Sequence, residues 1–436
     1  MTLVASSVGF TEEAFNHFVS SRDEPAWLRD MRAAAWRDFL AAPMPGPKQE
    51  EWMRTDIRMF RLEKFVFPVE PSPGATMPAS LLTHGVDLGG HATTLDSHAV
   101  SSQLDRKWAD QGVLFGSLDG LVAEHGDLIK PHLFRAVNPR ADKFSLLHAA
   151  AWSGGTLLYV PRGVRIDRPL HMLTALTAGS TDLSHTLVIL EDGAEATLLA
   201  ETASVDETGM GLHCGAIELI VGPRARLRYV NLQNWSTQVW HFAHQKALVD
   251  RDASLQWTIA ALGSRLAKVN QHVGLMGDGA ECQVNGVVFA EGKQHLSYNT
   301  LQHHEAPHCR SDLLYKGALQ DAARLVWRGM IKVDKGAQKT DGYQRNDNLM
   351  LSDHARSDSI PGLEIEADDV RCTHGSTTGR VDDEQIFYAR CRGLTRKEAI
   401  RMIVAGFFQQ VFDRITIESV RDALGEAIGR RIREYE

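Results

Sequence analysis

Short clusters of Asp, Gly and Ala recur between the strand-like segments of this 436-residue chain, and they constrain its fold more than any other feature. Each cluster contains an alanine, and these alanines stand at positions 194, 225, 253, 280, 323, 337 and 355. Successive alanines are 31, 28, 27, 43, 14 and 18 residues apart, so most steps lie near one or two units of about 14 residues. A small residue at a repeating corner is what a stacked β-solenoid requires, because each coil buries its inward side chains on the coils above and below.

The segments between these clusters resemble short β-strands. They are rich in aliphatic and β-branched residues, as at 156–160, 186–190, 216–221 and 325–327. An antiparallel β-sandwich also places a turn about every 8–12 residues. The spacing therefore favours the solenoid and leaves the sandwich open.

Both ends of the chain are predicted to be α-helical. Pro25 stands in a first helical turn, apolar residues then recur every three or four positions, and prolines at 43, 45 and 47 end the helix. Near the other end, Thr395 and Glu398 form a capping-box pattern ahead of a broad apolar face. The expected organisation is an N-terminal helical domain over 1–70, a mixed region over 71–143, a β core over 144–381 and a C-terminal helical domain over 382–436.

Composition and charge limit the partners of the chain. Lys and Arg number 47 against 55 Asp and Glu, and the resulting net charge of −8 gives no general attraction to nucleic acid or anionic lipid. No stretch approaches the roughly 18 apolar residues of a membrane span, and the first ten residues lack the pattern of an export signal. Five cysteines, an odd number, favour a reducing compartment over a disulfide framework. We expect a soluble cytoplasmic protein that binds neither nucleic acid nor membrane.

Two motifs of known chemistry are incomplete in this chain. Residues 304–308 spell the zinc-protease pattern H-E-x-x-H, in which two histidines share one face of a helix. Pro307 lies inside the turn that this motif needs, so the protease interpretation is rejected, although a metal contact by His303, His304 or His308 stays open. Residues 286–293 resemble a phosphate-binding loop only loosely, since Gln294 replaces the Ser or Thr that contacts magnesium. We expect this chain to bind no nucleotide.

Cys372 and His374 are the strongest metal-ligand candidates. Residues two apart on a strand point to the same side, so a thiolate and an imidazole could face one ion of iron, zinc or copper(I). Two ligands are too few for a closed structural site, so the rest of the chain or a second chain must supply more. The alternative is a buried cysteine beside a surface histidine. Cys214, Cys282 and Cys309 are interpreted as packed core thiols.

A long family signature begins in the second half of the β core. It runs through WRGMIKVDKGAQKTDGYQRNDNLMLSD at 327–353, IPGLEIEADDV at 360–370, CTHGSTTG at 372–379 and DEQIFY at 383–388. Further matching residues are Tyr229, Gln233-Asn234-Trp235, Pro47-Lys48, Glu51-Trp52, Arg54-Thr55, Arg392-Gly393 and Gly406-Phe407. Nearly the whole chain resembles the SufB/SufD scaffold family of iron–sulfur cluster assembly. The Cys-x-His-Gly form at 372–375 is similar to the SufD branch.

The resemblance implies a mostly β protein with a right-handed parallel β-helix core between N-terminal and C-terminal α-helical domains. It implies a non-catalytic subunit that pairs with a SufB-like scaffold subunit and binds a SufC-like ATPase through its C-terminal helices. The contact residues expected there are Arg392, Gly393, Ile403, Gly406 and Phe407. By the same resemblance, Cys372 and His374 contribute ligands to iron or a nascent iron–sulfur cluster at the interface with SufB.

Two other functions stay open at this point. A β-helix carbohydrate-active enzyme would need paired carboxylates above a sugar groove, and no such pair stands out. A SufD-like homodimer acting in iron delivery would share the fold and the ligands. Co-purification with SufB-like and SufC-like proteins would distinguish the scaffold from the homodimer.

Overall fold

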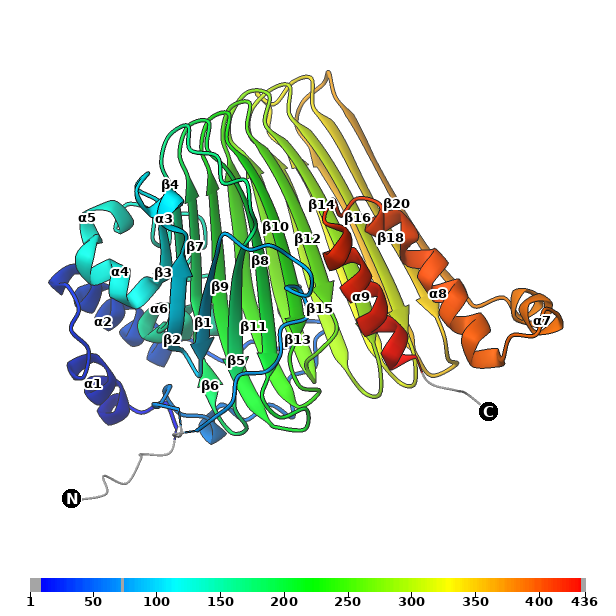
Figure 1. The fold of residues 1–436 in the computed structure, drawn as a ribbon, viewed down its shortest axis with the longest axis horizontal. Helices are drawn as coiled ribbons and strands as arrows, with labels where there is room; N and C mark the ends of the chain where they lie inside the picture. Colours follow the sequence, from blue (N-terminus) through cyan, green and yellow to red (C-terminus); the bar gives the residue numbers. More distant parts are fainter. Residues whose placement is uncertain (1–8, 72–73, 433–436) are drawn as a thin grey trace.

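The computed structural model describes residues 9–71 and 74–432, and its centre is a parallel β-solenoid (Figure 1). Strands alternate between two sheets, called sheet A and sheet B here. Sheet A has the order β2 (His98–Leu104), β1 (Gly90–Leu95), β5 (Leu170–Leu176), β8 (Glu195–Ser204), β10 (Arg226–Asn234), β12 (Ser254–Ala261), β14 (Glu281–Ala290), β16 (Arg310–Leu319), β18 (Asp341–Met350), β20 (Arg371–Arg380). Sheet B has the order β19 (Arg356–Ile365), β17 (Arg324–Val333), β15 (His295–His304), β13 (Leu266–Leu275), β11 (Val239–Val249), β9 (Gly211–Val221), β7 (His185–Leu190), β4 (Gly155–Val160), β3 (Leu114–Ser117), with β6 (Thr181–Asp182) beside β9. The solenoid is therefore confirmed and the sandwich is excluded.

The recurring alanines occupy the corners of the coils. Ala194, Ala225, Ala253 and Ala280 each directly precede a strand of sheet A and are at most 1% exposed. Their steps of 31, 28 and 27 residues each span one full coil. The step of 14 residues from 323 to 337 spans half a coil, from one corner to the next. This explains why two periods appear in the sequence.

The residue before each corner alanine adopts a left-handed backbone conformation. Its φ is +70° at Gly193, +57° at Arg224 and +56° at Asp252. In this conformation its N–H reaches the next coil, as when Asp252 N donates to the carbonyl of Asp278 at 3.0 Å. The backbone ladder thus continues around the corner. Gly or Asp, which adopt this conformation most readily, precedes three of these four alanines, and Arg224 precedes the fourth.

The inward side chains fill the lumen of the solenoid. Its middle contains large aromatic side chains, and Trp257, Tyr298, Tyr315 and Trp327 are at most 1% exposed. Each coil stacks these side chains on those of its neighbours, so the coils share one continuous core.

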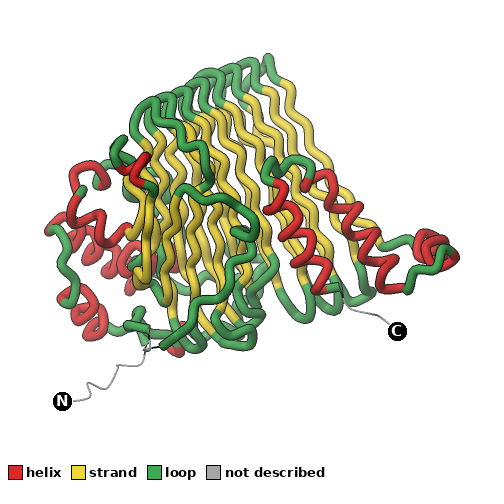
Figure 2. Tube along the Cα trace, viewed as in Figure 1, coloured by secondary structure: helices red, strands yellow, loops and turns green. Residues whose placement is uncertain are grey.

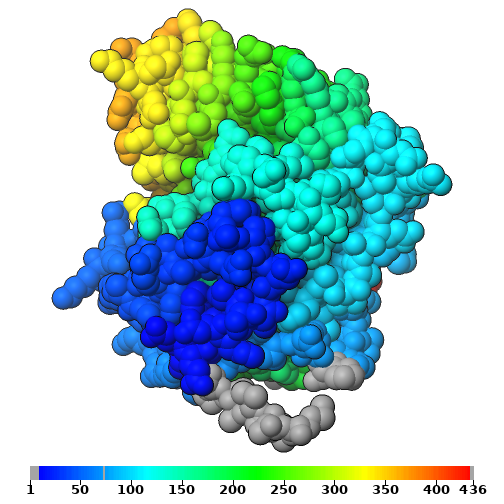
Figure 3. Space-filling model, turned by 90° about the vertical axis from the view of Figure 1, so that its left-hand side faces the viewer, coloured from blue at the N-terminus to red at the C-terminus, as the bar shows by residue number. Residues whose placement is uncertain are grey.

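The N-terminal region covers one end of the solenoid and part of the outer face of sheet B (Figures 1 and 3). Its helices are α1 (Glu12–Ser20), α2 (Ala26–Ala41), the 3-10 helix η1 (Leu62–Lys64), α3 (Arg106–Ala109), α4 (Leu118–Glu124), α5 (Gly126–Ile129) and α6 (Lys143–Ala151). Phe144 of α6 stacks on Phe242 of β11, with 3.7 Å between ring centroids. Two details differ from expectation: α6 stands where strands were expected from residue 144, and the mixed region contributes β1, β2 and β3 to the two sheets.

The C-terminal region consists of α7 (Asp383–Cys391), α8 (Arg396–Phe412) and α9 (Glu418–Arg431). The capping box of Thr395 and Glu398 begins α8, as predicted. Helices α8 and α9 lie on the outer face of sheet A (Figure 2), where Val404 and Phe408 of α8 join one apolar cluster with Leu314 of β16. Within the described ranges, every helix is too short or too polar to cross a membrane.

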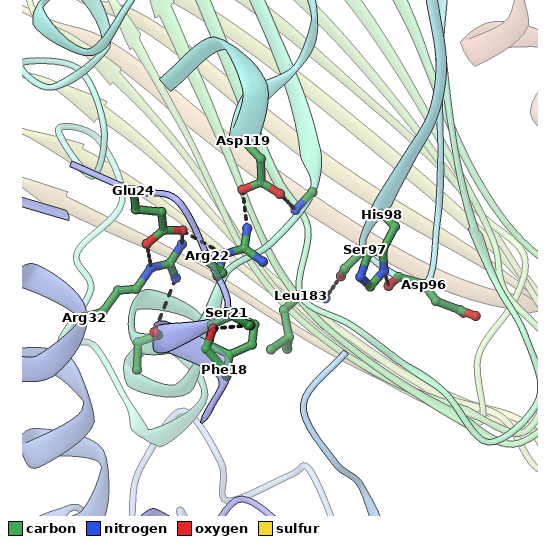
Figure 4. Close-up of polar contacts among 12 residues, drawn as sticks. Phe18, Ser21, Arg22, Glu24, Arg32, Asp96, Ser97, His98, Asp119 and Leu183 are labelled. Carbon is green, nitrogen blue, oxygen red and sulfur yellow. Dashed lines mark hydrogen bonds and ion pairs between the residues drawn. The ribbon is translucent and has the colours of Figure 1, made fainter. Parts of the chain in front are cut away.

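A network of buried ion pairs joins the N-terminal helices to the start of the solenoid (Figure 4). Arg32 is fully buried and donates from Nε and Nη2 to the two carboxylate oxygens of Glu24, at 2.8 and 2.7 Å. Arg22 bridges Glu24 and Asp119 of α4, and Asp119 accepts a hydrogen bond from the backbone N–H of Gly154. Burial raises the pKa of Glu24, but Arg32 and Arg22 outweigh this and hold it below its ordinary value.

Replacing Glu24 with Gln should lower the free energy of unfolding by about 3 kcal/mol, because Arg32 then stays buried without its counter-charge. Since the pKa of Glu24 is depressed in the folded protein, its contribution is complete above the unfolded pKa of about 4.3 and is lost as pH falls through the folded value. Urea titrations at pH 7 and pH 4 measure both effects. Asp110→Asn, which removes an exposed ion pair, should leave the urea midpoint unchanged. An equal loss in both variants would contradict the interpretation.

Candidate functional site

The last coil of the solenoid is open to solvent. Strands β19 and β20 stand last in their sheets, so each pairs with a neighbour on one side only within the described chain. None of their residues is buried, whereas β17 and β18, one coil earlier, are largely buried. An unpaired strand edge presents free N–H and C=O groups, and another chain can pair with them.

Cys372 lies on β20 and faces inward. It pairs in register with Gly342 of β18 and packs against an apolar cluster that includes Ile331 and Val333. A Cβ at Gly342 would stand 3.2 Å from the Cys372 sulfur, so the glycine makes room for the thiol. Burial raises the pKa of Cys372, so the thiol stays protonated at neutral pH until a metal ion or another cation favours the thiolate.

His374 lies two residues further along β20, and its side chain is exposed. It pairs in register with Gln344 of β18, which is fully buried and donates from Nε2 to the carbonyl of Gly362 at 2.9 Å. The alternation of the strand puts Cys372 and His374 on the same side of β20, as the sequence predicts. In the part of the chain that the structure describes, no group of three or more His, Cys, Asp or Glu side chains is arranged to hold a metal.

The lumen is polar where it meets this open end. Asn348 Nδ2 donates to Asn346 Oδ1 at 2.7 Å and to Ser359 Oγ at 2.9 Å, and Ser359 Oγ donates to Asn346 Oδ1 at 2.5 Å. Asn346 and Asn348 are at most 3% exposed. The aromatic core of the middle coils is thus replaced by a hydrogen-bonded amide cluster beneath β20.

The histidines of the H-E-x-x-H pattern do not converge. His304 points into the lumen and lies 2.8 Å from Ser311 Oγ. His308 is at a corner outside the lumen, with φ +55°, and its Nδ1 lies 2.8 Å from a carboxylate oxygen of Asp278. The two histidines therefore do not share the helix face that the zinc-protease motif needs, and His304 is a buried residue of the lumen. His303 lies between two carboxylates on the outer face.

The three other cysteines of the β core are packed thiols, as predicted. Cys214, Cys282 and Cys309 are at most 5% exposed, and none forms a disulfide. Burial raises the pKa of all three thiols, that of Cys309 to about 11. They are therefore poor nucleophiles in the folded chain.

The C-terminal helices present a second exposed surface. Of the expected contact residues, Arg392, Gly393 and Gly406 are exposed, and Ile403 and Phe407 are half-buried against the solenoid. Three exposed large apolar side chains of these helices were not predicted from the sequence as contact residues: Phe387 at 69%, Tyr388 at 63% and Met402 at 54%. The adjacent Phe and Tyr in DEQIFY could have indicated an exposed apolar surface, because one face of a short helix cannot bury both side chains.

Thiol alkylation of the native protein should follow the exposure of each cysteine. We expect exposed Cys391 to react first, and Cys372 to react slowly at pH 7 and faster as pH rises, because its thiol must ionise. Cys214, Cys282 and Cys309 should react only after denaturation. Mass spectrometry of peptides after N-ethylmaleimide treatment measures the order. Equal rates for Cys372 and Cys391 at pH 7 would contradict the inward placement of Cys372.

Comparison with known proteins places this architecture in a family. Residues 173–407 match the SufBD core domain of SUF system FeS cluster assembly, and residues 14–172 match the SufBD protein N-terminal region. An iron–sulfur cluster assembly SufBD family protein of Staphylococcus saprophyticus is 27% identical over 435 residues, which cover 96% of this chain and 92% of the relative. Relatives of the same description from Staphylococcus haemolyticus and Staphylococcus aureus are 26% identical over the same length and coverage. With two family domains that together span residues 14–407, this β-solenoid chain belongs to the SufBD family of iron–sulfur cluster assembly proteins.

Proposed function

We propose that this chain is a SufD-like, non-catalytic scaffold subunit that contributes Cys372 and His374 as ligands for iron or a nascent iron–sulfur cluster, its transient cargo. The observation that carries the proposal is the open last coil, where both residues share one side of an unpaired edge strand. Family membership supports a place in cluster assembly, and the Cys-x-His-Gly segment supports the SufD branch.

The open edge supports a partner solenoid as the second half of the site. A tetrahedral metal site with Cys and His ligands usually takes four, and β20 offers two. A SufB-like chain that pairs with β19 or β20 would satisfy the free backbone groups and bring its own ligands to the same place. Hydrogen bonds among Asn346, Asn348 and Ser359 make this end of the lumen polar, so it tolerates contact with water before a partner chain binds.

Metal binding must displace the proton of the Cys372 thiol. Because burial raises the pKa of this thiol, the free site binds metal more weakly as pH falls. Metal binding that weakens as pH falls suits a transient site, which must release its iron or cluster. His374, exposed beside it, can approach an ion from solvent or from the partner chain.

The exposed surface of α7 and α8 supports a second partner, a SufC-like ATPase. Large apolar side chains exposed together are rare on monomers and typical of docking surfaces. Phe387 and Tyr388 lie on α7, where Tyr388 contacts the guanidinium of Arg392, and Met402 lies on α8. The nucleotide would be bound by that partner, since this chain has no phosphate-binding loop.

Replacing His374 with Ala should lower the iron and sulfide content of the complex severalfold when the chain is co-expressed anaerobically with SufB-like and SufC-like subunits. Folding and ATPase binding should be retained, because the side chain is exposed. His308→Ala, at another exposed histidine, is the control and should load normally. Unchanged loading in the His374 variant would refute the ligand assignment, and recovery of a homodimer alone would favour iron delivery.

Replacing Phe387 with Asp should abolish co-purification of the ATPase subunit while the chain stays folded, because this ring is 69% exposed. Val100→Asp, on β2 at the far end of the solenoid, is a matched control at 52% exposure and should not affect binding. Removal of everything after Gly393 is a poorer test, since it would uncover the apolar outer face of sheet A. Retained binding by the Phe387 variant would place the ATPase elsewhere.

A further inference from the structure

Three titratable side chains form a buried chain of hydrogen bonds where the N-terminal region meets the outer face of sheet B. They are His148 of α6, His185 of β7 and Glu218 of β9, and each is at most 2% exposed. His148 Nε2 lies 3.0 Å from His185 Nδ1, and His185 Nε2 lies 3.1 Å from Glu218 Oε1. At the other end of the chain, His148 Nδ1 lies 3.0 Å from the backbone carbonyl oxygen of Cys214. None of the residues proposed as metal ligands or partner contacts takes part in it.

Glu218 is held as a carboxylate, because its backbone partners are all N–H donors. Its Oε1 accepts a hydrogen bond from the N–H of Phe134 at 2.6 Å. Its Oε2 accepts from the N–H groups of Ala136 and Val137 at 2.6 and 3.0 Å. Together with His185, these donors occupy the four acceptor positions of a carboxylate. A protonated acid would aim its own hydrogen at a donor and leave it without an acceptor.

The three contacts of the two histidine rings require three protons. A backbone carbonyl oxygen and a carboxylate can only accept, so His148 Nδ1 and His185 Nε2 must each carry a hydrogen. The contact between the rings needs a third hydrogen, because two nitrogen lone pairs would repel each other at 3.0 Å. Two neutral imidazoles carry only two. The pair therefore holds one extra proton, whose charge balances that of Glu218.

The surroundings keep His148 neutral. Burial and the charge of His185 lower the pKa of His148 well below its ordinary value, so the extra proton resides on His185, beside the carboxylate. His185 is fully buried and packs against the rings of Phe134 and Trp152, with 5.0 and 5.9 Å between ring centroids. The other titratable or charged groups near these residues are His132 and Arg135 in the connection before α6, Glu191 after β7, His213 on β9 and His244 on β11.

Glu218 also holds a strained turn in place. Phe134 has a φ of +56°, a left-handed conformation that residues other than glycine rarely adopt. Its N–H and those of Ala136 and Val137 converge on one carboxylate, as in the backbone nests that bind anions. The turn belongs to the connection between α5 and α6, so the carboxylate ties this connection to β9.

We propose that His148, His185 and Glu218 form a proton-dependent clamp, in which one buried proton holds α6 and the α5–α6 connection against sheet B. Loss of that proton leaves Glu218 facing a nitrogen lone pair with its charge unbalanced inside the protein, so the clamp weakens as pH rises. The clamp is a property of the single chain, and it does not depend on iron binding.

Nuclear magnetic resonance of the full-length chain labelled with ¹⁵N-histidine counts the protons directly. Two-bond ¹H–¹⁵N spectra distinguish a protonated ring nitrogen from one with a lone pair, and the variants His148→Gln and His185→Gln assign the signals. We expect three of the four ring nitrogens of these two histidines to be protonated at pH 7, with His148 Nε2 the exception. Two or four protonated nitrogens would overturn the proposal.

Hydrogen–deuterium exchange measures how firmly the turn is held. Glu218→Gln keeps the volume of the side chain and removes its charge, so exchange of peptides covering 134–137 should rise about tenfold, the factor for one lost charge-assisted hydrogen bond. Glu201→Gln is the matched control, because this buried carboxylate on β8 accepts hydrogen bonds from the N–H groups of Leu81 and Leu82. It should raise exchange at 81–82 and leave 134–137 unchanged. An equal rise at 134–137 in both variants, or none in Glu218→Gln, would overturn the proposal.

The pH dependence distinguishes a proton-dependent clamp from a merely structural contact. After correction for the intrinsic exchange rate, exchange at 134–137 in the wild type should rise severalfold as pH increases from 7 to 10. His185→Gln should lose this dependence, because an amide N–H can donate to Glu218 at every pH in this range. A constant rate in the wild type, or the same pH dependence in the variant, would overturn the proposal.

Discussion

The backbone hydrogen bonds between successive coils are the constraint on which the rest of this structure depends. They continue from the strands through the corners, where a left-handed residue such as Asp252 donates to the next coil. Because the ladder is unbroken, the register of every coil is fixed by the one before it. Inward side chains then stack in columns, and outward side chains form rows such as Lys316, Asp347 and Thr377. The solenoid thereby acquires a lumen, two outer faces and two ends, and each has a different use.

The two outer faces are covered by opposite ends of the chain. The N-terminal region packs on sheet B through aromatic contacts and is held to the start of the solenoid by the Arg32–Glu24 network. The C-terminal helices pack on sheet A through an apolar cluster and leave part of α7 and α8 exposed. Both helical regions lie outside the lumen, so neither closes the last coil (Figure 1).

Sequence reasoning recovered the features that depend on local chemistry. The corner alanines, the capping box of Thr395, the end of α2 before Pro43 and the buried thiols need only a few neighbouring residues to be recognised. Features that depend on the register between strands could not be predicted from the sequence. His304 and His308 lie on different sides of one wall because the chain turns a corner between them. Lys316 lies beside Asp347 only because β16 and β18 pair in register. The placement of β1 and β2 in the solenoid depends on pairing with strands far along the chain.

The two ends of the solenoid are closed to different degrees, and this difference sets a limit on assembly. At the first end, β2 and β3 turn the sheets antiparallel and the N-terminal helices gather around them. At the last end, β19 and β20 each have one edge without a partner strand among the described residues, next to the hydrogen-bonded Asn346, Asn348 and Ser359. A rod with two open ends would add subunits without limit and grow into a filament. A rod with one open end can join at most one other rod through that end, so the fold limits any contact made there to two chains.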